Sequence, residues 1–192
     1  MQYDKILSLN LHSKLNTAMK KTISNDIITL RSLEPTDLDV LYQWENDTSL
    51  WTVSNIMAPS PKSYLWQYLQ NYDSDIYNTR QLRLMVTLTT TGEAIGTIDL
   101  TNLDPLNNRA ELGILIDHAH EGKGYGSEAL KLTIGYVRDY LGLFQLYTLV
   151  PTNNTACIAL LKKHGFTTSG CLKDWINHGT ELHDVNIMQL IF

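Results

Sequence analysis

The sequence predicts a single α+β domain whose central sheet contains strands in both directions. Alternating apolar residues in the middle of the chain predict antiparallel strands. An apolar strand then passes through a glycine-rich turn into a helix, and further strands and a helix follow. The 192 residues suffice to bury one hydrophobic core without disulfides or metals.

The first 25 residues are expected to form an N-terminal extension, either a frayed tail or a helical arm, because their leucines are spread among polar residues. They lack the continuous apolar core of a signal peptide. No apolar run in the chain approaches the ~18 residues that a membrane span requires. We therefore expect one domain over residues 26–192 and no membrane partner.

The first elements of the domain are a strand and two helices. The segment DIITLRSL, residues 26–33, is predicted to be the strand. The segment EPTDLDVLYQWEN begins a helix near Pro35, a residue that is common in the first helical turn. Apolar residues at helical spacing predict a second helix from Ser60 to Tyr72.

Three consecutive antiparallel strands are predicted next. QLRLMVTLT (81–89) alternates apolar and polar residues, IGTIDLTNL (95–103) follows the turn TTGEA, and RAELGILID (109–117) follows the turn DPLNN. Strands joined by such short turns are neighbours in the sheet. Gly113 interrupts the third strand and indicates a bulge or a close backbone approach.

The second half of the chain returns to helices and strands. A helix is predicted from about Gly126 to Leu141 and a strand from Gln145 to Val150. The helix NNTACIALLKKHGF is capped by Asn153 or Asn154 and ends at Gly165. TTSGCL and HDVNIMQLIF are predicted to be two further strands.

The glycine loop, defined as residues 121–127, predicts an anion site. It reads EGKGYGS and places glycines at alternate positions before a helix, where several backbone N–H groups can converge on a phosphate or pyrophosphate. Lys123 adds a cation. The alternative is a tight turn that binds nothing. The motif GxxxxGK[ST] is absent, and the spacing GxGxG does not match GxGxxG, which disfavours kinases, ATPases and dinucleotide folds.

Composition excludes several other classes. The net charge of −5 disfavours a nucleic-acid partner, which normally requires a basic surface. Cys157 and Cys171 form no CxxC motif, and both are expected to stay reduced, as in the cytoplasm. His118 and His120 have no third ligand at a suitable spacing, so no metal is predicted.

The order of these motifs resembles the GNAT family of acyl-CoA N-acyltransferases. Antiparallel strands lead into the xGxGxG turn and a helix, and a segment N-x10-G-F follows from Asn154 to Phe166. The resemblance covers roughly residues 26–192 and is nearest to the spermidine/spermine acetyltransferase-like branch, with ribosomal-protein N-terminal acetyltransferases close to it. It implies a mixed central sheet of about seven strands, splayed at the cofactor site, with helices on both faces.

The resemblance also implies acetyl-CoA as co-substrate, held in a V between the strand ending at Asp117 and the strand at 145–150. The implied cofactor-binding residues are Ile114, Leu115, Ile116, Glu121, Gly122, Lys123, Gly124, Tyr125, Gly126, Ser127 and Asn154. Two positions depart from the family pattern. Glu121 stands where the family has Gln or Arg, and Leu161 stands where many relatives place the Tyr that protonates the leaving thiolate.

Glu111 is the predicted catalytic residue. Acyl transfer requires a neutral amine, a stabilised oxyanion and a leaving thiolate. Relatives often carry a Glu at this position that acts as a base through water, and strand alternation puts Glu111 on the same face as Leu115. The alternative is a surface or ion-paired carboxylate. The oxyanion would be held by backbone N–H groups near the expected bulge.

The acceptor pocket is expected to combine aromatic and acidic side chains, which suit a cationic amine. The predicted substrate-binding residues are Trp44, Glu45, Trp51, Asp174 and Trp175. Taken singly, each tryptophan is favoured as a packing residue. Cys157 is interpreted as a buried thiol rather than as an acyl-carrying nucleophile.

The sequence therefore predicts an N-acetyltransferase that transfers the acetyl group of acetyl-CoA directly to a primary amine, a polyamine or another small cationic amine. The alternatives are an N-terminal acetyltransferase of the ribosomal-protein type, a non-catalytic acyl-CoA-binding sensor and a nucleotide-binding protein. A homo-oligomer would match the rings that spermidine-type relatives form.

Overall fold

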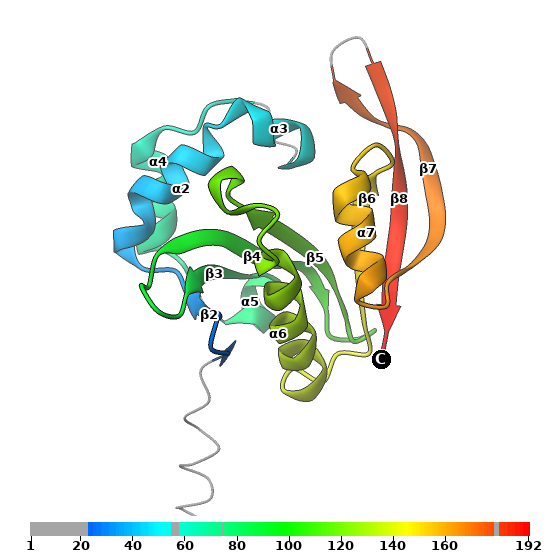
Figure 1. The fold of residues 1–192 in the computed structure, drawn as a ribbon, viewed down its shortest axis with the longest axis horizontal. Helices are drawn as coiled ribbons and strands as arrows, with labels where there is room; N and C mark the ends of the chain where they lie inside the picture. The colour runs from blue at the N-terminus through cyan, green and yellow to red at the C-terminus, as the bar shows by residue number, and fades with distance from the viewer. Residues whose placement is uncertain (1–22, 55–57, 74, 179–180) are drawn as a thin grey trace, which may run out of the picture.

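The computed structural model describes residues 23–54, 58–73, 75–178 and 181–192. An eight-stranded mixed sheet is at its centre, in the order β1-β2-β3-β4-β5-β6-β8-β7 (Figure 1). The strands are β1 (Ile23–Ser24), β2 (Ile28–Ser32), β3 (Leu82–Leu88), β4 (Ala94–Asp104), β5 (Arg109–Ile116), β6 (Gln145–Pro151), β7 (Thr167–His178) and β8 (Glu181–Ile191). The helices are η1 (Pro35–Asp37), α2 (Leu38–Glu45), α3 (Thr48–Ser54), α4 (Lys62–Gln70), α5 (Ile76–Thr79), η2 (His118–His120), α6 (Tyr125–Asp139) and α7 (Thr155–Lys163).

The predicted α+β class is confirmed, with one strand more than expected. All neighbouring strands are antiparallel except β5 and β6, which are parallel. The additional strand, β1, pairs Ile23 with Leu30, so the sheet begins before the predicted domain start at Asp26. The predicted extension up to residue 22 lies outside the described residues.

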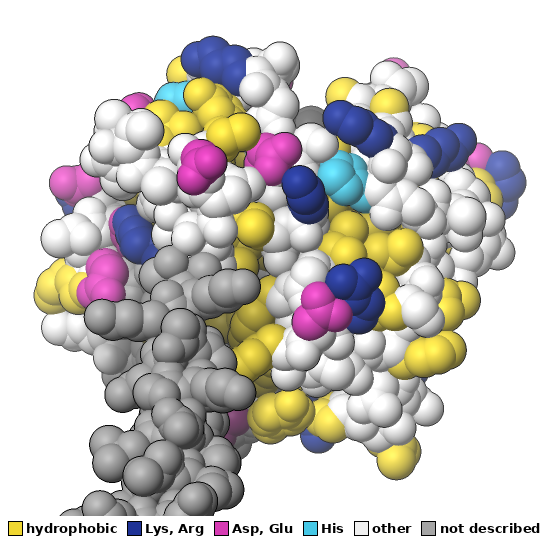
Figure 2. Space-filling view, turned by 60° about the horizontal axis from the view of Figure 1, so that its bottom comes forward, with side chains coloured by type: hydrophobic (Ala, Val, Ile, Leu, Met, Phe, Trp, Pro, Cys, Tyr) yellow, Lys and Arg dark blue, Asp and Glu magenta, His cyan; other side chains and the backbone are white. Residues whose placement is uncertain are grey.

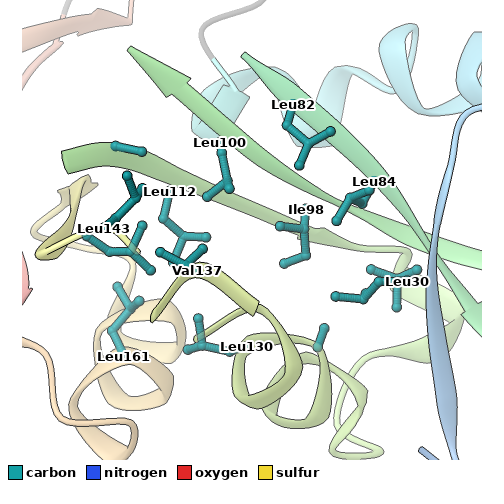
Figure 3. Packing of buried hydrophobic residues seen from close by; sticks show 14 of the residues in the cluster. Leu30, Leu82, Leu84, Ile98, Leu100, Leu112, Leu130, Val137, Leu143 and Leu161 are labelled. Carbon is teal, nitrogen blue, oxygen red and sulfur yellow. The ribbon is translucent and has the colours of Figure 1, made fainter. Parts of the chain in front are cut away.

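Helices cover both faces of the sheet, as the family resemblance implies. The larger core packs α6 and α7 against one face, and Figure 3 shows Leu130 and Val137 of α6 near Leu112 of β5. The second core packs α2, α3 and α4 against the opposite face, around Met85 of β3. Leu115 of β5 packs against the second core. Strand β5 therefore presents side chains alternately to the two cores.

A buried carboxylate connects the start of α2 to strand β2. The side chain of Asp37 is only 4% exposed and receives two 2.7 Å hydrogen bonds from the guanidinium of Arg31. Asp37 also accepts the backbone N–H of Glu34 at 2.8 Å, which caps the turn that Pro35 begins. This arrangement fixes the direction in which the chain leaves the sheet toward α2 and α3.

Of the two alternatives predicted at Gly113, a bulge or a close backbone approach, the structure has the close approach. Gly113 lies directly opposite Asp99 in a regular ladder, and the β4–β5 register shifts instead between Thr101 and Asp104. Asn102, inside the shifted segment, has a φ of 49°. The glycine does permit a close approach, because a Cβ at residue 113 would lie 3.3 Å from the Cβ of Asp99.

Candidate functional site

Strands β5 and β6 separate soon after they meet. Their parallel pairing covers only 109–111 with 145–147, although β5 continues to Ile116 and β6 to Pro151. Their outer edges are paired with β4 and β8. Beyond these three pairs, the facing edges of β5 and β6 have no strand partner in the described part of the chain. An extended ligand can hydrogen-bond such edges as an added strand does.

The glycine loop lies beyond the open end of this splay, between η2 and α6. Gly122 and Gly124 have φ values of 72° and 86°, a conformation that glycine adopts without strain. The N–H groups of Ser127 and Glu128 donate to the carbonyl of Gly124. Those of residues 122–126 have no acceptor among the described residues. These amides and the positive end of the α6 dipole fit a diphosphate.

The charged side chains of the loop bond within the protein. The carboxylate of Glu121 lies 3.0 Å from Nδ1 of His118. The ammonium of Lys123, predicted as a cation for the phosphate, donates to the carbonyl of Ala119 at 2.9 Å. The backbone amides of residues 122–126 are therefore the groups of the loop that stay available to an anion.

The start of α6 lies close to α7 and to the end of β5. An added Cβ on Gly126 would lie 3.4 Å from Leu160 and 3.5 Å from Ile116. Asn154 caps α7, where its Oδ1 accepts the N–H of Cys157 at 3.1 Å. The side-chain NH₂ of Asn154 has no partner among the described residues and remains available to a ligand.

Glu111 lies at the closed end of the splay. It pairs with Tyr147 in the last of the parallel β5–β6 pairs. Its half-buried carboxylate accepts a 2.7 Å hydrogen bond from Nδ2 of Asn102, and the hydroxyl of Tyr147 is 3.5 Å away. Burial, and then the charge of Glu111, raises the pKa of Tyr147. The phenol is therefore protonated at neutral pH. Oε2 of Glu111 thus faces two hydrogen-bond donors, the amide of Asn102 and the hydroxyl of Tyr147.

Leu161, at the position where the family resemblance implies a tyrosine, provides no proton donor. Leu161 is 1% exposed and belongs to the larger core, where Figure 3 shows it below Leu143. Cys157, one helical turn earlier, is a free cysteine, and burial raises the pKa of its thiol. A raised thiol pKa lowers the thiolate fraction and agrees with the interpretation of Cys157 as a packing residue.

The five predicted substrate-binding residues fall into two separate groups. Trp44 is 7% exposed and belongs to the second core, so its ring packs inside the protein. Nearby, Nε1 of Trp51 donates to the backbone carbonyl of Glu45 at 3.0 Å. Asp174 and Trp175 lie on β7, and Trp175 is 59% exposed. Figure 1 shows α3 and the β7–β8 hairpin on opposite sides of the splay.

An ion cluster that the sequence reasoning missed lies beside Gly113. Nε of Arg83 donates to Asp99 at 2.5 Å, and its Nη1 lies 3.3 Å from Glu45. The guanidinium stands 5.9 Å from the ring centre of Tyr68, whose pKa burial raises to about 12. This cluster connects the end of α2 to the two strands that precede β5.

Two further predictions concern metals and membranes. Among the described residues, no three His, Cys, Asp or Glu side chains are grouped as metal ligands. None of the helices in the described ranges has both the length and the apolar character needed to span a bilayer.

Comparisons with known proteins identify relatives over most of the chain. The model of the acetyltransferase (GNAT) domain matches residues 28–167. The uncharacterized N-acetyltransferase p20 of Bacillus licheniformis is 30% identical over 171 residues, which are 89% of this chain and 96% of that protein. Spermidine N(1)-acetyltransferase of Escherichia coli K12 is 30% identical over 143 residues, 74% of each chain.

Solved structures agree with the fold. Spermidine N-acetyltransferase of Vibrio cholerae in complex with CoA and spermine has a TM-score of 0.79 at 23% identity, covering 87% of this chain and 96% of that one. A dodecameric structure of the V. cholerae enzyme has a TM-score of 0.72 at 24% identity, covering 87% of this chain and 95% of that one. At these identities the likeness concerns the fold.

Proposed function

Because the chain belongs to the GNAT acetyltransferase family, we propose that it acetylates a primary amine of a polyamine or another small cationic amine, with acetyl-CoA as donor. The enzyme class, N-acetyltransferase, follows from the family. The observation that carries the polyamine assignment is the 30% identity to the E. coli spermidine enzyme over 74% of the chain. The net charge of −5 also favours a cationic acceptor.

The splay and the glycine loop together suit acetyl-CoA. In this proposal the amides of residues 122–126 bind the diphosphate, and the backbone of residues 114–116 pairs with the amides of the pantetheine arm. The five steps from Ile116 to Glu111 span roughly 17 Å at about 3.3 Å per residue. A donor arm that follows β5 from the loop therefore brings its reactive end toward Glu111. Acetyl-CoA supplies an activated thioester, and the protein aligns it.

Glu111 is the proposed general base. At neutral pH a primary amine is largely protonated, because its ordinary pKa is about 10. A carboxylate at the closed end of the splay can remove that proton through one water, so that the amine attacks as a neutral nucleophile. Since Gly113 forms no bulge, we assign the oxyanion to N–H groups on the unpaired edge of β5. Leu161 cannot protonate the leaving thiolate. The thiolate of coenzyme A is a fair leaving group even when no general acid protonates it.

The remaining acceptor contacts are proposed for residues on either side of the splay. Trp51 and Glu45 on one side, and Asp174 and Trp175 on the other, offer aromatic faces and carboxylates on elements that Figure 1 shows flanking the splay. Glu45 already pairs with Arg83. The carboxylate of Asp174, which is not paired with Arg83, is therefore the better candidate to bind a cationic amine.

We also propose a cytoplasmic homo-oligomer, as the dodecameric V. cholerae relative supports. Three segments meet at one end of the molecule, where the N–H of Phe144 donates to Asn108 and the N–H of Phe192 donates to Phe144. The exposed apolar side chains of these segments are Leu106, Tyr140, Phe144 and Ile191. Figure 2, in which this end comes forward, shows apolar side chains gathered on that face. Exposed apolar surface of this kind suits a subunit contact.

An amine panel tests the proposed function. With acetyl-CoA, spermidine and spermine should release free thiol faster than single amines or peptides, and mass spectrometry should find one added acetyl group on the polyamine. Acetylation of peptide N-termini alone would favour the ribosomal-protein-type alternative. Coenzyme A binding without thiol release on any amine would favour a sensor. Stabilisation by ATP or NAD but not by acetyl-CoA would favour a nucleotide-binding protein.

Replacing Gly124 by valine should raise the KM for acetyl-CoA about tenfold or more. A β-branched residue is strained at φ 86°, by more than the 1–2 kcal/mol that other residues lose there, so the loop would shift its amides. A Cβ at residue 124 meets nothing within 4 Å, so the effect is conformational rather than a clash. Initial rates at varied acetyl-CoA concentration measure it.

Gly92→Val is the matched control for Gly124→Val. Gly92 has a φ of 75°, and its added Cβ likewise meets nothing within 4 Å. It lies in the β3–β4 turn, outside the glycine loop, and the neighbouring Glu93 reaches no further than His120, at 3.5 Å. Gly92→Val should lower stability to a similar extent and leave the KM for acetyl-CoA unchanged. Equal KM values for the two variants would remove the glycine loop from the binding site.

A further inference from the structure

A chain of hydrogen bonds connects the glycine loop to the segment that begins α3. Nδ1 of His118 lies 3.0 Å from the carboxylate of Glu121, and its Nε2 lies 2.8 Å from the hydroxyl of Ser49. The same hydroxyl lies 2.6 Å from Oδ1 of Asp47. Figure 1 shows the turn after β5 beside α3. We call Asp47, Ser49, His118 and Glu121 the His118 network.

Counting protons assigns a charge state to this network. An ionised carboxylate only accepts hydrogen bonds, so Nδ1 of His118 must donate to Glu121 and the Ser49 hydroxyl must donate to Asp47. Ser49 has then used its one proton, and Nε2 of His118 must donate to it. All three bonds form together only when both ring nitrogens carry protons. The complete network therefore contains an imidazolium between two carboxylates.

The other charged groups of the turn have partners of their own. Asp117 and Glu93 lie 3.4 Å and 3.5 Å from the two ring nitrogens of His120. The ammonium of Lys123 donates to the carbonyl of Ala119. Glu121 and, through Ser49, Asp47 are thus the charged groups that the hydrogen bonds of His118 reach among the described residues.

We propose that His118 is a positioning residue for coenzyme A binding: as an imidazolium tied to Ser49, it neutralises the Glu121 carboxylate and holds it at the edge of the glycine loop. An unpaired carboxylate at residue 121 would repel the diphosphate that the neighbouring amides bind. His118 thus compensates for the negative charge that Glu121 places in the loop. The proposal rests on the proposed function, because it assumes that the loop binds coenzyme A.

Calorimetry with coenzyme A tests the proposal on the wild-type protein, His118→Ala, Glu121→Gln and the double variant. Titrations are made at about pH 6 and about pH 9. At the lower pH, His118→Ala should weaken binding about fivefold, the upper range for one exposed ion pair. At the higher pH, a network that has lost one ring proton would no longer neutralise Glu121, and the difference from wild type should largely disappear. Each ratio compares proteins at one pH, which cancels the titration of the ligand's phosphates.

Two results separate positioning from a general structural effect. The double variant should bind coenzyme A as tightly as Glu121→Gln, because without the carboxylate there is nothing to neutralise. Kinetics of His118→Ala at the lower pH should show a raised KM for acetyl-CoA and an unchanged kcat. His183→Ala, which removes a half-buried histidine 3.7 Å from Glu181 on the β7–β8 hairpin, is the matched control and should leave the affinity unchanged.

A wild-type affinity in His118→Ala at both pH values would overturn the proposal while leaving the acetyltransferase assignment intact. So would a double variant that stays as weak as His118→Ala alone. Failure of the wild-type protein to bind coenzyme A would overturn both this proposal and the proposed function.

Discussion

Replacing Arg83 by alanine should lower the free energy of unfolding by about 2–3 kcal/mol. The side chains of Arg83, Asp99 and Glu45 are 27%, 22% and 22% exposed, so water screens their charges only in part. Burial has the largest single effect and acts to lower the pKa of Arg83, but Asp99, Tyr68 and Glu45 together raise it by more, and the net shift is upward. Without the guanidinium, two carboxylates would face each other beside Tyr68 and Gly113 with no cation between them.

Urea unfolding measures this loss, and Arg138→Ala is its matched control. Arg138 also forms a hydrogen-bonded pair with a carboxylate, that of Asp139, but the two side chains are 54% and 64% exposed. An exposed pair of this kind contributes at most about 1 kcal/mol. If Arg83→Ala destabilises the protein no more than Arg138→Ala does, the Arg83 cluster is not an important part of the fold.

The elements with a clear hydrophobic period were predicted well. The alternation in residues 81–89, 95–103 and 109–117 gave β3, β4 and β5 to within one or two residues at most ends. Pro35 and Gly165 marked a helix start and a helix end correctly, because each residue restricts or permits one backbone conformation. Such features depend only on residues that are close together in the chain, so they can be read from the sequence.

The failures concern features that depend on partners far along the chain. Strand β1 has two residues and exists through its pairing with Thr29 and Leu30, which no local pattern indicates. At Gly113 the choice between a bulge and a close approach depended on Asp99, the residue opposite, and thus on the register. The β4–β5 register shifts around Asn102, and nothing in the sequence predicts the positive φ of that residue.

The same reason explains which site features were missed. The glycine loop could be predicted from the spacing of its glycines, because its conformation depends on the residue types within the loop itself. The separation of β5 from β6 was implied by the family resemblance, and the three-residue pairing confirms it. The Arg83 cluster and the His118 network join segments that lie 16 to 69 residues apart, so that only the folded chain brings their charges together.

Replacing Glu111 by glutamine should lower kcat with the true amine about 100-fold at neutral pH. The amide keeps the shape of the side chain and can still accept the hydrogen bond of Asn102. It cannot take a proton from the attacking amine. The KM for acetyl-CoA should stay unchanged, because Glu111 lies at the closed end of the splay and the glycine loop lies beyond the other end. Steady-state kinetics with saturating acetyl-CoA measure the loss.

The pH profile distinguishes a lost base from a general distortion. The amine deprotonates without help as the pH approaches its own pKa of about 10, so the deficit of Glu111→Gln should shrink steadily with rising pH. A distorted site would show the same deficit at every pH. Tyr147→Phe removes the hydroxyl 3.5 Å from Glu111 while keeping the ring, and it should cost less than about threefold in kcat. A loss in Tyr147→Phe as large as that in Glu111→Gln would contradict the assignment of the base to Glu111 alone, because it would show that the phenol hydroxyl, which lies 3.5 Å from the carboxylate, is equally required.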